Sequence, residues 1–221
     1  MIKGVIFDFN GTLYYDTDIH VEVWRELYKE LSNNRDDFDE VFGQVFGGSN
    51  KIILEHLFKT FGKPISEERI EELSQYKEKL YRDYSVEHDR CHLVPGASEV
   101  MSKLKEMLPI NIATASIIEN VDFFYREFKI GQWFDHDLIV YDDGTYPNKQ
   151  MMYIKAATNI GLKPEECLIF EDSRLGIKNA YLAGCHNIVA LNPHGTKMLL
   201  PGVIANIRDF TEFDFELLKN N

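Results

Sequence analysis

The 221-residue chain lacks the features that mark several large classes of protein. It has three cysteines, and Cys91, Cys167 and Cys185 are scattered without a C-x-x-C spacing, so neither a disulfide framework nor a zinc site is expected. No apolar run approaches the roughly eighteen residues that a membrane-spanning helix needs. The N-terminus carries no cleavable signal features. We therefore expect a cytoplasmic protein that does not bind a membrane.

Positive charge is also scarce, because 24 Lys and Arg residues face 36 Asp and Glu residues and the net charge is −12. No basic stripe overrides this balance, so we expect no nucleic-acid partner. A phosphate-bearing substrate would need local positive charge, which a divalent cation and a few placed lysines could supply. The hydrophobic share of 44%, with 13% aromatic residues, is that of a globular protein with a full core.

A short strand-like segment opens the chain and a long helical stretch follows it. The apolar run at residues 5–7 ends at Asp8, and the chain turns at once through Gly11. Residues 16–88 then show hydrophobic side chains at three- and four-residue spacing in four successive segments. Four amphipathic helices in sequence predict a small helical bundle.

From about residue 89 onward, strand-like and helix-like segments alternate. Strict alternation predicts an α/β fold with a Rossmann-like, doubly wound parallel sheet, to which the first strand also belongs. The later strands are expected at residues 110–114, 138–141, 167–170 and 187–191. We therefore expect a core domain of residues 1–15 and 89–221 and an inserted α-helical domain of residues 16–88.

Polar side chains fall at or just beyond the expected carboxyl ends of these strands, or in the loops that follow them. The set comprises Asp8 with Asn10, Thr114 with Ser116, Lys149, and Glu171 with Asp172. Because the carboxyl ends of parallel strands share the edge at which ligands bind, these side chains are expected to converge. An isolated Asp or Thr at a strand end is more often a helix cap than a functional residue. Adjacent Glu171 and Asp172, however, would repel each other unless a cation or solvent faced them, which predicts a divalent-cation site.

The order of these motifs resembles the haloacid dehalogenase-like phosphohydrolase superfamily, and the helical insertion resembles its helical cap. The most similar subgroup contains β-phosphoglucomutase and related small-molecule phosphatases. The resemblance implies that Asp8 attacks phosphorus to form an aspartyl-phosphate. It also implies that Thr114 hydrogen-bonds the transferring phosphoryl group and that Lys149 neutralises the charge around it.

The same resemblance implies a Mg²⁺ ion and a set of substrate contacts. The ion would be held by the Asp8 carboxylate, the backbone carbonyl of Asn10 and Asp172, with Glu171 coordinating directly or through water. The residues that it assigns to substrate binding are His20, Gly48, Ser49, Lys51, Ala115 and Ser116.

Asn10 departs from the pattern of this superfamily, whose phosphatases mostly carry a second aspartate there. That aspartate protonates the leaving group and later activates water, whereas an amide cannot release and retake a proton. We therefore expect a preference for acyl phosphates, phosphoanhydrides or other substrates whose leaving group has a low pKa. His20 could substitute as the acid, or it could simply belong to the surface between cap and core.

Two further departures concern a lysine and the cap loop. Lys149 lies four residues before Tyr153 instead of six, so its loop must differ, and a solvated loop lysine is the alternative reading. In the cap loop, Asn50 stands where phosphoglucomutase relatives have an arginine that grips the distal phosphate. Lys51 is a poorer match than a guanidinium, which favours a phosphatase over a mutase.

Three functions therefore remain open from the sequence. The leading one is a Mg²⁺-dependent phosphohydrolase acting on a small phosphorylated metabolite, as a monomer or weak homodimer. The second is a sugar-phosphate isomerase of the β-phosphoglucomutase type. The third is a catalytically weakened protein that binds a phosphorylated ligand and regulates another process, for which Asn10 is the sequence support.

Overall fold

The computed structural model describes residues 1–219, and they form two compact units. The first, here called the sheet unit, comprises Met1–Asp16 and Cys91–Asn221, and the second, the helical unit, comprises Thr17–Arg90. Each unit has its own hydrophobic core and is described separately. The assignment of these units as catalytic core and cap domain stays a prediction.

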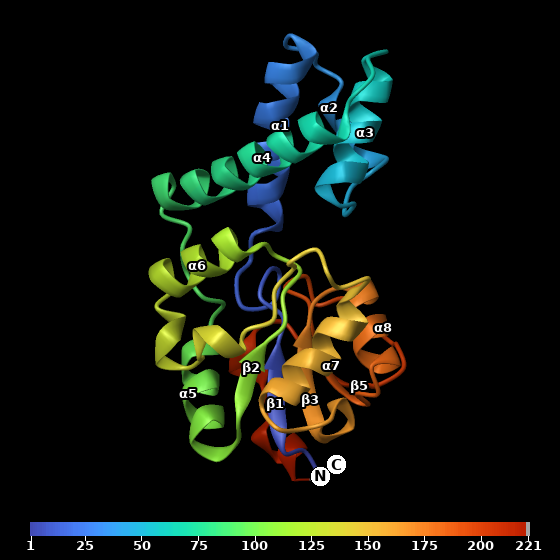
Figure 1. Ribbon diagram of the computed structural model, residues 1–221. Coiled ribbons are helices and arrows are strands. Elements are labelled where there is room, and N and C mark those ends of the chain that lie inside the picture. Colours follow the sequence, from blue (N-terminus) through green and yellow to red (C-terminus); the bar gives the residue numbers. More distant parts are fainter. Residues whose placement is uncertain (220–221) are drawn as a thin grey trace. The chain divides into compact units, whose positions relative to one another are not determined.

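The sheet unit contains a five-stranded parallel sheet in the order β2-β1-β3-β4-β5 (Figure 1). The strands are β1 (Gly4–Phe7), β2 (Ile110–Ile112), β3 (Cys167–Glu171), β4 (Asn187–Leu191) and β5 (Val203–Ile207). Every residue of the central strands β1 and β3 is buried, as expected for a parallel sheet covered on both faces. The predicted α/β fold with a doubly wound parallel sheet is confirmed.

Successive side chains of the central strands enter different layers of the core. Ile6 and Ile169 are paired in register and join the cluster that α7 and α8 cover, whereas Phe7 and Phe170 stack with ring centroids 4.9 Å apart and contact Phe210. Helix α7 contacts β1 and β2, and α8 contacts β3 and β4 (Figure 1). The helices of this unit are α5 (Ala97–Met107), α6 (Ile118–Glu127), α7 (Lys149–Asn159) and α8 (Arg174–Leu182). Its 3₁₀ segments are η1 (Ile130–Gln132), η2 (His136–Leu138), η3 (Pro164–Glu166), η4 (Phe210–Glu212) and η5 (Phe215–Leu218).

The strand predicted at residues 138–141 is wrong. That segment begins in the 3₁₀ turn η2, and only Val140 forms a bridge, an isolated one to Ala113. The Leu138 carbonyl accepts hydrogen bonds from the side-chain amides of Asn111 and Asn159, each at 2.8 Å. Because side chains satisfy this carbonyl, the segment is held against β2 without a full ladder.

Strand β5 was not predicted. It is an edge strand, half-buried over most of its length, and it follows a loop at residues 192–202 rather than a helix. Strict strand–helix alternation in the sequence therefore does not indicate it. Its carboxyl end lies beside that of β4, because the backbone N–H of Asn192 donates to the carbonyl of Ile207 at 2.9 Å.

The helical unit contains four helices around an aromatic-rich core. They are α1 (Thr17–Ser32), α2 (Phe38–Gly43), α3 (Asn50–Thr60) and α4 (Glu67–Glu87), and α4 contacts both α1 and α3. Ser49 and Ser66 cap α3 and α4 by accepting backbone N–H groups of the first turns. Tyr28, Phe38 and Phe42 are buried, and the Phe38 ring contacts the other two, which fixes the short helix α2 against α1.

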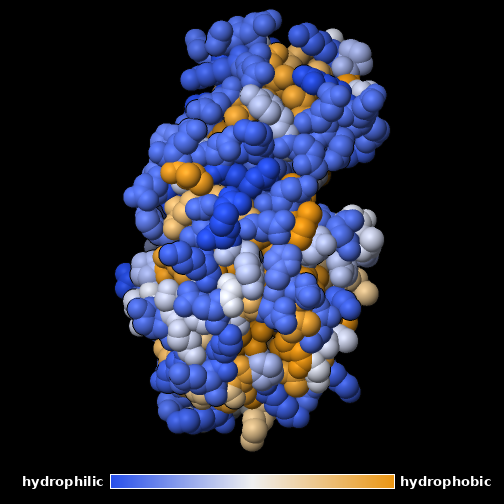
Figure 2. Space-filling view, turned by 60° about the vertical axis from the view of Figure 1, so that its left-hand side comes forward, coloured by the Kyte–Doolittle hydropathy of each residue, from blue (hydrophilic) through white to orange (hydrophobic). Residues whose placement is uncertain are grey.

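Hydrophilic residues predominate on the face drawn in Figure 2, with hydrophobic residues in small groups. Within residues 1–219, no helix has the length and apolar character needed to cross a bilayer.

Candidate active site

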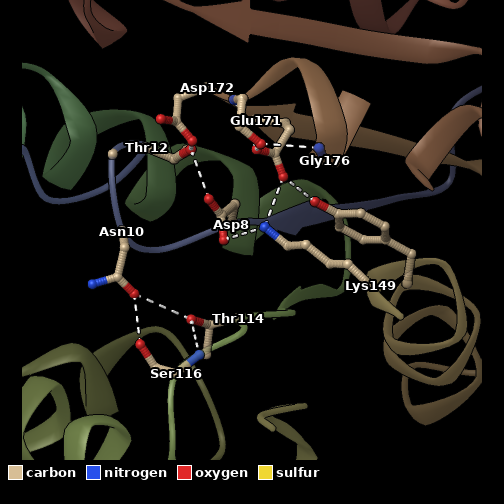
Figure 3. A network of polar contacts seen from close by, with 12 residues as sticks. Asp8, Asn10, Thr12, Thr114, Ser116, Lys149, Glu171, Asp172 and Gly176 are labelled. Atoms are coloured by element: carbon tan, nitrogen blue, oxygen red, sulfur yellow. Dashed lines mark hydrogen bonds and ion pairs between the residues drawn. The ribbon is translucent and has the colours of Figure 1, made fainter. Parts of the chain in front are cut away.

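Three carboxylates lie where the carboxyl ends of β1 and β3 meet. Phe7 of β1 pairs with Phe170 of β3, and the backbone N–H of Asp8 donates to the carbonyl of Phe170 at 3.0 Å. This pairing brings Asp8 beside Glu171 and Asp172 (Figure 3). In a sheet of order 2-1-3-4-5, β1 and β3 flank the point at which the winding reverses, where α/β folds bind ligands.

Lys149 supplies the positive charge at this edge. It is the first residue of α7, behind the cap Asn148, and its Nζ lies 2.6 Å from Asp8 Oδ1 and 2.7 Å from Glu171 Oε2. The four-residue spacing to Tyr153 places both side chains on one face of α7, and the Tyr153 hydroxyl also donates to Glu171. The shorter spacing noted in the sequence therefore still delivers the ammonium to Asp8.

Both carboxylate oxygens of Glu171 accept hydrogen bonds. Oε2 accepts from Lys149 and Tyr153, and Oε1 accepts from the backbone N–H and hydroxyl of Ser173 at 2.9 and 2.8 Å. A Cβ atom at Gly176 would lie 2.1 Å from the Glu171 carboxyl carbon, so the first turn of α8 can approach only because that residue is glycine. Glu171 thus holds Lys149 against Asp8 (Figure 3).

Burial has the largest single effect on the pKa of each of the three carboxyl groups. It raises the pKa of Asp8 and of Asp172, and the charge of Glu171 adds to the rise at both, while Lys149 opposes it. Burial also disfavours the Glu171 carboxylate, but Lys149 outweighs this and lowers its pKa. Lys149 is likewise held charged against its burial, because Asp8 and Glu171 raise its pKa. One ammonium therefore does not neutralise these three acids, of which Asp8 and Glu171 are buried and Asp172 is half-buried.

This donor set fits a divalent cation such as Mg²⁺. One oxygen from each of Asp8, Glu171 and Asp172 lies within 4.8 Å of the others, and hard cations take carboxylate oxygens. A bound cation would favour the charged forms of Asp8 and Asp172 and so lower their pKa values. Since both Glu171 oxygens already accept two donors, Asp8 and Asp172 are better placed for direct coordination. Gly11, with φ of +77°, passes so close that a Cβ there would lie 2.1 Å from the Asp172 carboxylate.

Asn10 is fixed by contacts at both ends of its amide. Its Nδ2 donates to Asp16 Oδ2 at 2.5 Å, while its Oδ1 accepts from the hydroxyls of Ser116, at 2.7 Å, and Thr114, at 3.3 Å. The Gly11 backbone N–H also donates to Asp16, at 3.1 Å. Because a carboxylate can only accept, the amide orientation is determined. Asn10 therefore links the β1 loop to the segment that follows β2.

Thr114 and Ser116 lie together at the end of β2, as the sequence predicts. The Ser116 backbone N–H donates to Thr114 Oγ1 at 3.2 Å, and the Thr114 side chain is buried. Ala115, between them, is exposed. The Lys149 ammonium contacts the Asp8 carboxylate directly, as does the Thr12 hydroxyl, which donates to Asp8 Oδ2 at 3.3 Å (Figure 3). The hydroxyls of Thr114 and Ser116 contact Asn10 instead.

Comparison with known proteins agrees with this arrangement. Residues 2–184 match the family described as haloacid dehalogenase-like hydrolase. The chain belongs to this family. Among its relatives is the Bacillus subtilis (strain 168) protein named "Putative phosphatase YhcW", 29% identical over 224 residues, which span 99% of this chain and 96% of the relative. The validoxylamine A 7'-phosphate phosphatase of Streptomyces hygroscopicus subsp. limoneus is 24% identical over 215 residues, 96% of each chain.

Solved structures of the haloacid dehalogenase-like family have the same fold. A hydrolase of family IA, variant 3, from Entamoeba histolytica superposes with a TM-score of 0.88 at 32% identity, covering 99% of this chain and all of the other. A β-phosphoglucomutase from Clostridium difficile superposes with a TM-score of 0.77 at 21% identity, covering 99% and 96% of the two chains. At 21% identity, the similarity to the β-phosphoglucomutase concerns the fold alone.

The remaining predicted site residues belong to the helical unit of this hydrolase. Ser49 is the cap of α3, and Gly48 precedes it, with its backbone N–H donating to the Val45 carbonyl. Lys51 is exposed, and its Nζ lies 2.8 Å from both carboxylate oxygens of Glu67. An ion pair so exposed can open at little cost. The roles of these residues toward a substrate stay predictions.

His20 belongs to a buried polar cluster of the helical unit that the sequence did not reveal. Its Nδ1 lies 2.8 Å from the Nζ of Lys77, and its ring stacks on Tyr81 with centroids 4.4 Å apart. Lys77 is 3% exposed and lies 2.9 Å from Glu78, which also accepts from the Asn50 amide at 2.8 Å. Lys77 and Glu78 look like solvated helix charges in the sequence, and only their burial distinguishes them.

Proposed function

We propose that this chain is a Mg²⁺-dependent phosphohydrolase that acts on a small phosphorylated metabolite through an aspartyl-phosphate on Asp8. The observation that carries the proposal is the buried Asp8 carboxylate at the end of β1, 2.6 Å from the Lys149 ammonium. Glu171, at the end of β3, in turn holds that ammonium. The relatives named as phosphatases support the same reaction class.

The reaction would proceed in two displacements at phosphorus. An Asp8 oxygen forms a bond to phosphorus while the bond to the leaving-group oxygen breaks, and the leaving group keeps the electron pair. Water then attacks phosphorus while the bond to Asp8 breaks, so that Asp8 keeps the electron pair as a carboxylate and the protons of the water leave with inorganic phosphate. Lys149 stays charged throughout and offsets the negative charge of the phosphoryl oxygens, and Thr114 and Ser116 turn their hydroxyls from Asn10 to those oxygens.

Asp8, Asp172 and the Asn10 backbone carbonyl would hold the Mg²⁺ ion, with Glu171 acting through water. When bound, the ion supplies Lewis-acid stabilisation of phosphoryl charge and screens the carboxylate of Asp8 from the anionic substrate.

Asn10 limits the leaving groups that this site can expel. Its amide cannot donate and retake a proton, and both of its ends are already engaged with Asp16 and Ser116. We therefore propose a preference for acyl phosphates, phosphoanhydrides or other substrates whose leaving group has a low pKa. Such groups depart as anions and need little protonation.

The helical unit would serve as the cap that selects the substrate. The Asn50 side chain donates to Glu78 and offers no guanidinium, and Lys51 is paired with Glu67. A mutase needs a strong second grip on a bisphosphate intermediate, and the Lys51 ammonium is a poorer match for that role than a guanidinium. The phosphatase reading is accordingly the one we propose.

Phosphate release from a panel of phosphorylated metabolites in the presence of Mg²⁺ tests this function. The full-length chain is compared with Asp8→Asn, which keeps the size of the side chain and removes the nucleophile. We expect turnover of at least one panel member by the wild type and a loss of at least 10³-fold in the variant. Equal phosphate release by the two proteins, or conversion of glucose 1-phosphate to glucose 6-phosphate without release, would contradict the proposal.

A further inference from the structure

A cavity lined mainly by polar residues opens at the carboxyl ends of β4 and β5, away from the carboxylate cluster. It has a volume of about 260 Å³, and its walls come from the loop at residues 192–202 and from the turn after β5. Neighbouring strands lie about 4.8 Å apart, so in the order β2-β1-β3-β4-β5 this cavity is roughly 10–15 Å from Asp8 along the same edge of the sheet. It is therefore separate from the site of the proposed chemistry.

Unused hydrogen-bond donors gather in the loop wall of this cavity. Gly195, with φ of +73°, turns the chain, and the next two residues, Thr196 and Lys197, also line the cavity. Within residues 1–219, neither their backbone N–H groups, nor the Thr196 hydroxyl, nor the Lys197 ammonium has a hydrogen-bond partner or an ion-pair partner. Successive free N–H groups beside a left-handed residue form the kind of concavity that binds oxyanions.

Arg208, in the turn after β5, also lines the cavity, and its exposed guanidinium pairs with Glu212. Its Nε donates to Glu212 Oε1 at 2.8 Å, and its backbone N–H donates to Glu212 Oε2 at 2.9 Å. The Tyr15 hydroxyl donates to its backbone carbonyl. Guanidinium groups carry five N–H donors, so Glu212 orients Arg208 without using up its donors.

The charge of this cavity is opposite to that of the whole chain. Among the side chains that line the cavity, two are cationic, Lys197 and Arg208, and one is acidic, Glu212, in a protein whose net charge is −12. A carboxylate offers two oxygens in one plane, whereas these donors come from two walls and from backbone, hydroxyl, ammonium and guanidinium groups. Such a spread matches the three or four terminal oxygens of a tetrahedral dianion.

We propose that this cavity is an accessory phosphate-binding site, in which Lys197, Arg208 and the backbone N–H groups of Thr196 and Lys197 hold a phosphate dianion. The dianion is either free inorganic phosphate or the phosphoryl group of an organic ligand. Both share the chemistry that the cavity recognises, and the binding experiment distinguishes them.

Backbone amide NMR of the full-length chain in Mg²⁺-free buffer tests the site, with inorganic phosphate as the probe. We expect saturable shifts of the Gly195, Thr196 and Lys197 amide signals, which chloride at matched ionic strength does not produce. Lys197→Gln should raise the Kd for phosphate at this loop at least tenfold. Lys155→Gln, which removes one exposed charge from α7, should leave it unchanged.

A second variant guards against a local misfolding artefact. Arg208→Lys keeps the charge but loses the planar fork, so it should weaken binding less than Arg208→Gln. Shifts that chloride reproduces, or an unaltered Kd in Lys197→Gln and Arg208→Gln, would overturn the proposal. Tighter binding of inorganic phosphate than of methylphosphonate would assign the site to free phosphate. The reverse order would assign it to the phosphoryl group of an organic ligand, and either order supports an oxyanion site.

Discussion

The amide nitrogen of Asn10 lies 2.5 Å from the carboxylate of Asp16, and Asp16 is buried. This contact fixes which end of the Asn10 amide faces Ser116 and leaves the carbonyl oxygen as the acceptor on that side. It also sets the cost of replacing the amide. A carboxylate at position 10 would face a second carboxylate at hydrogen-bond distance, and two such groups share one proton.

Asn10→Asp should increase the hydrolysis of substrates with a poor leaving group. The shared proton would keep an acid in place, and general acid catalysis contributes on the order of 10²–10⁴-fold in rate. We expect a gain of at least tenfold in kcat/KM for a sugar phosphate and less than a threefold change for acetyl phosphate. Steady-state phosphate release by the wild type and the variant on both substrates measures this. An equal response of the two substrates would show that position 10 does not control leaving-group protonation.

The same variant should be less stable, and the loss should grow with pH. In the folded variant the pair of carboxylates has a raised pKa, whereas the unfolded side chains titrate near about 4. The penalty is therefore absent below about pH 4 and full once the pH exceeds the raised folded value, at about 2 kcal/mol. Thermal unfolding of Asn10→Asp at several pH values measures it.

The matched control for that experiment exchanges the amide of Asn10 and the carboxylate of Asp16. Asn10→Asp combined with Asp16→Asn keeps one amide and one carboxylate in contact, so most of the pH-dependent loss should disappear. A loss of the same size in the double variant would mean that repulsion from Asp16 is not its cause.

Lys149→Met should abolish most of the activity. It removes the ammonium that lies 2.6 Å from Asp8 and leaves Glu171 without its charged partner, and loss of such a stabilising group costs about 10²–10³-fold in kcat. Lys155→Met, on the exposed side of the same helix, serves as the control and should retain wild-type kcat. If the two variants lost activity equally, the cause would lie in α7 as a whole rather than in the ammonium.

Binding of Mg²⁺ should release protons and strengthen as the pH rises. Burial raises the pKa of Asp8 and Asp172 in the metal-free chain, and a cation requires their charged forms. Calorimetry in buffers of different ionisation enthalpy should show net proton release near neutral pH and less of it at alkaline pH. Asp172→Asn should lower the affinity at least tenfold. Affinity that does not change between pH 6 and 9 would contradict these protonation states.

The sequence predicts the convergence of acids well, because it depends on simple geometry. Asp8 and Glu171 each end a buried apolar run, and in a parallel sheet the ends of such runs share one edge. Lys149 is assigned in the sequence by its place after a strand expected at residues 138–141, although the structure has no strand there. Its contact with Asp8 depends on α7 starting at that residue, which the cap Asn148 fixes.

Other features depend on long-range contacts that no local pattern encodes. The segment at residues 138–141 is apolar enough for a strand. The side-chain amides of Asn111 and Asn159, however, donate hydrogen bonds to the Leu138 carbonyl, which a strand neighbour would otherwise use. The Asn10–Asp16 contact arises inside a turn whose path the sequence does not specify. Lys77 is charged and helical, so its burial beside His20 could not be expected from spacing.

Acid-quench labelling with ³²P-acetyl phosphate tests the central claim most directly, because it asks whether phosphate becomes attached to Asp8. The full-length enzyme is mixed with the labelled substrate and Mg²⁺ and quenched within milliseconds, and the label is mapped by peptide analysis. We expect a hydroxylamine-sensitive acyl phosphate on the peptide that contains Asp8, formed and lost at rates consistent with turnover, and no label in Asp8→Asn. Turnover without label on Asp8, or equal labelling of the variant, would contradict the account.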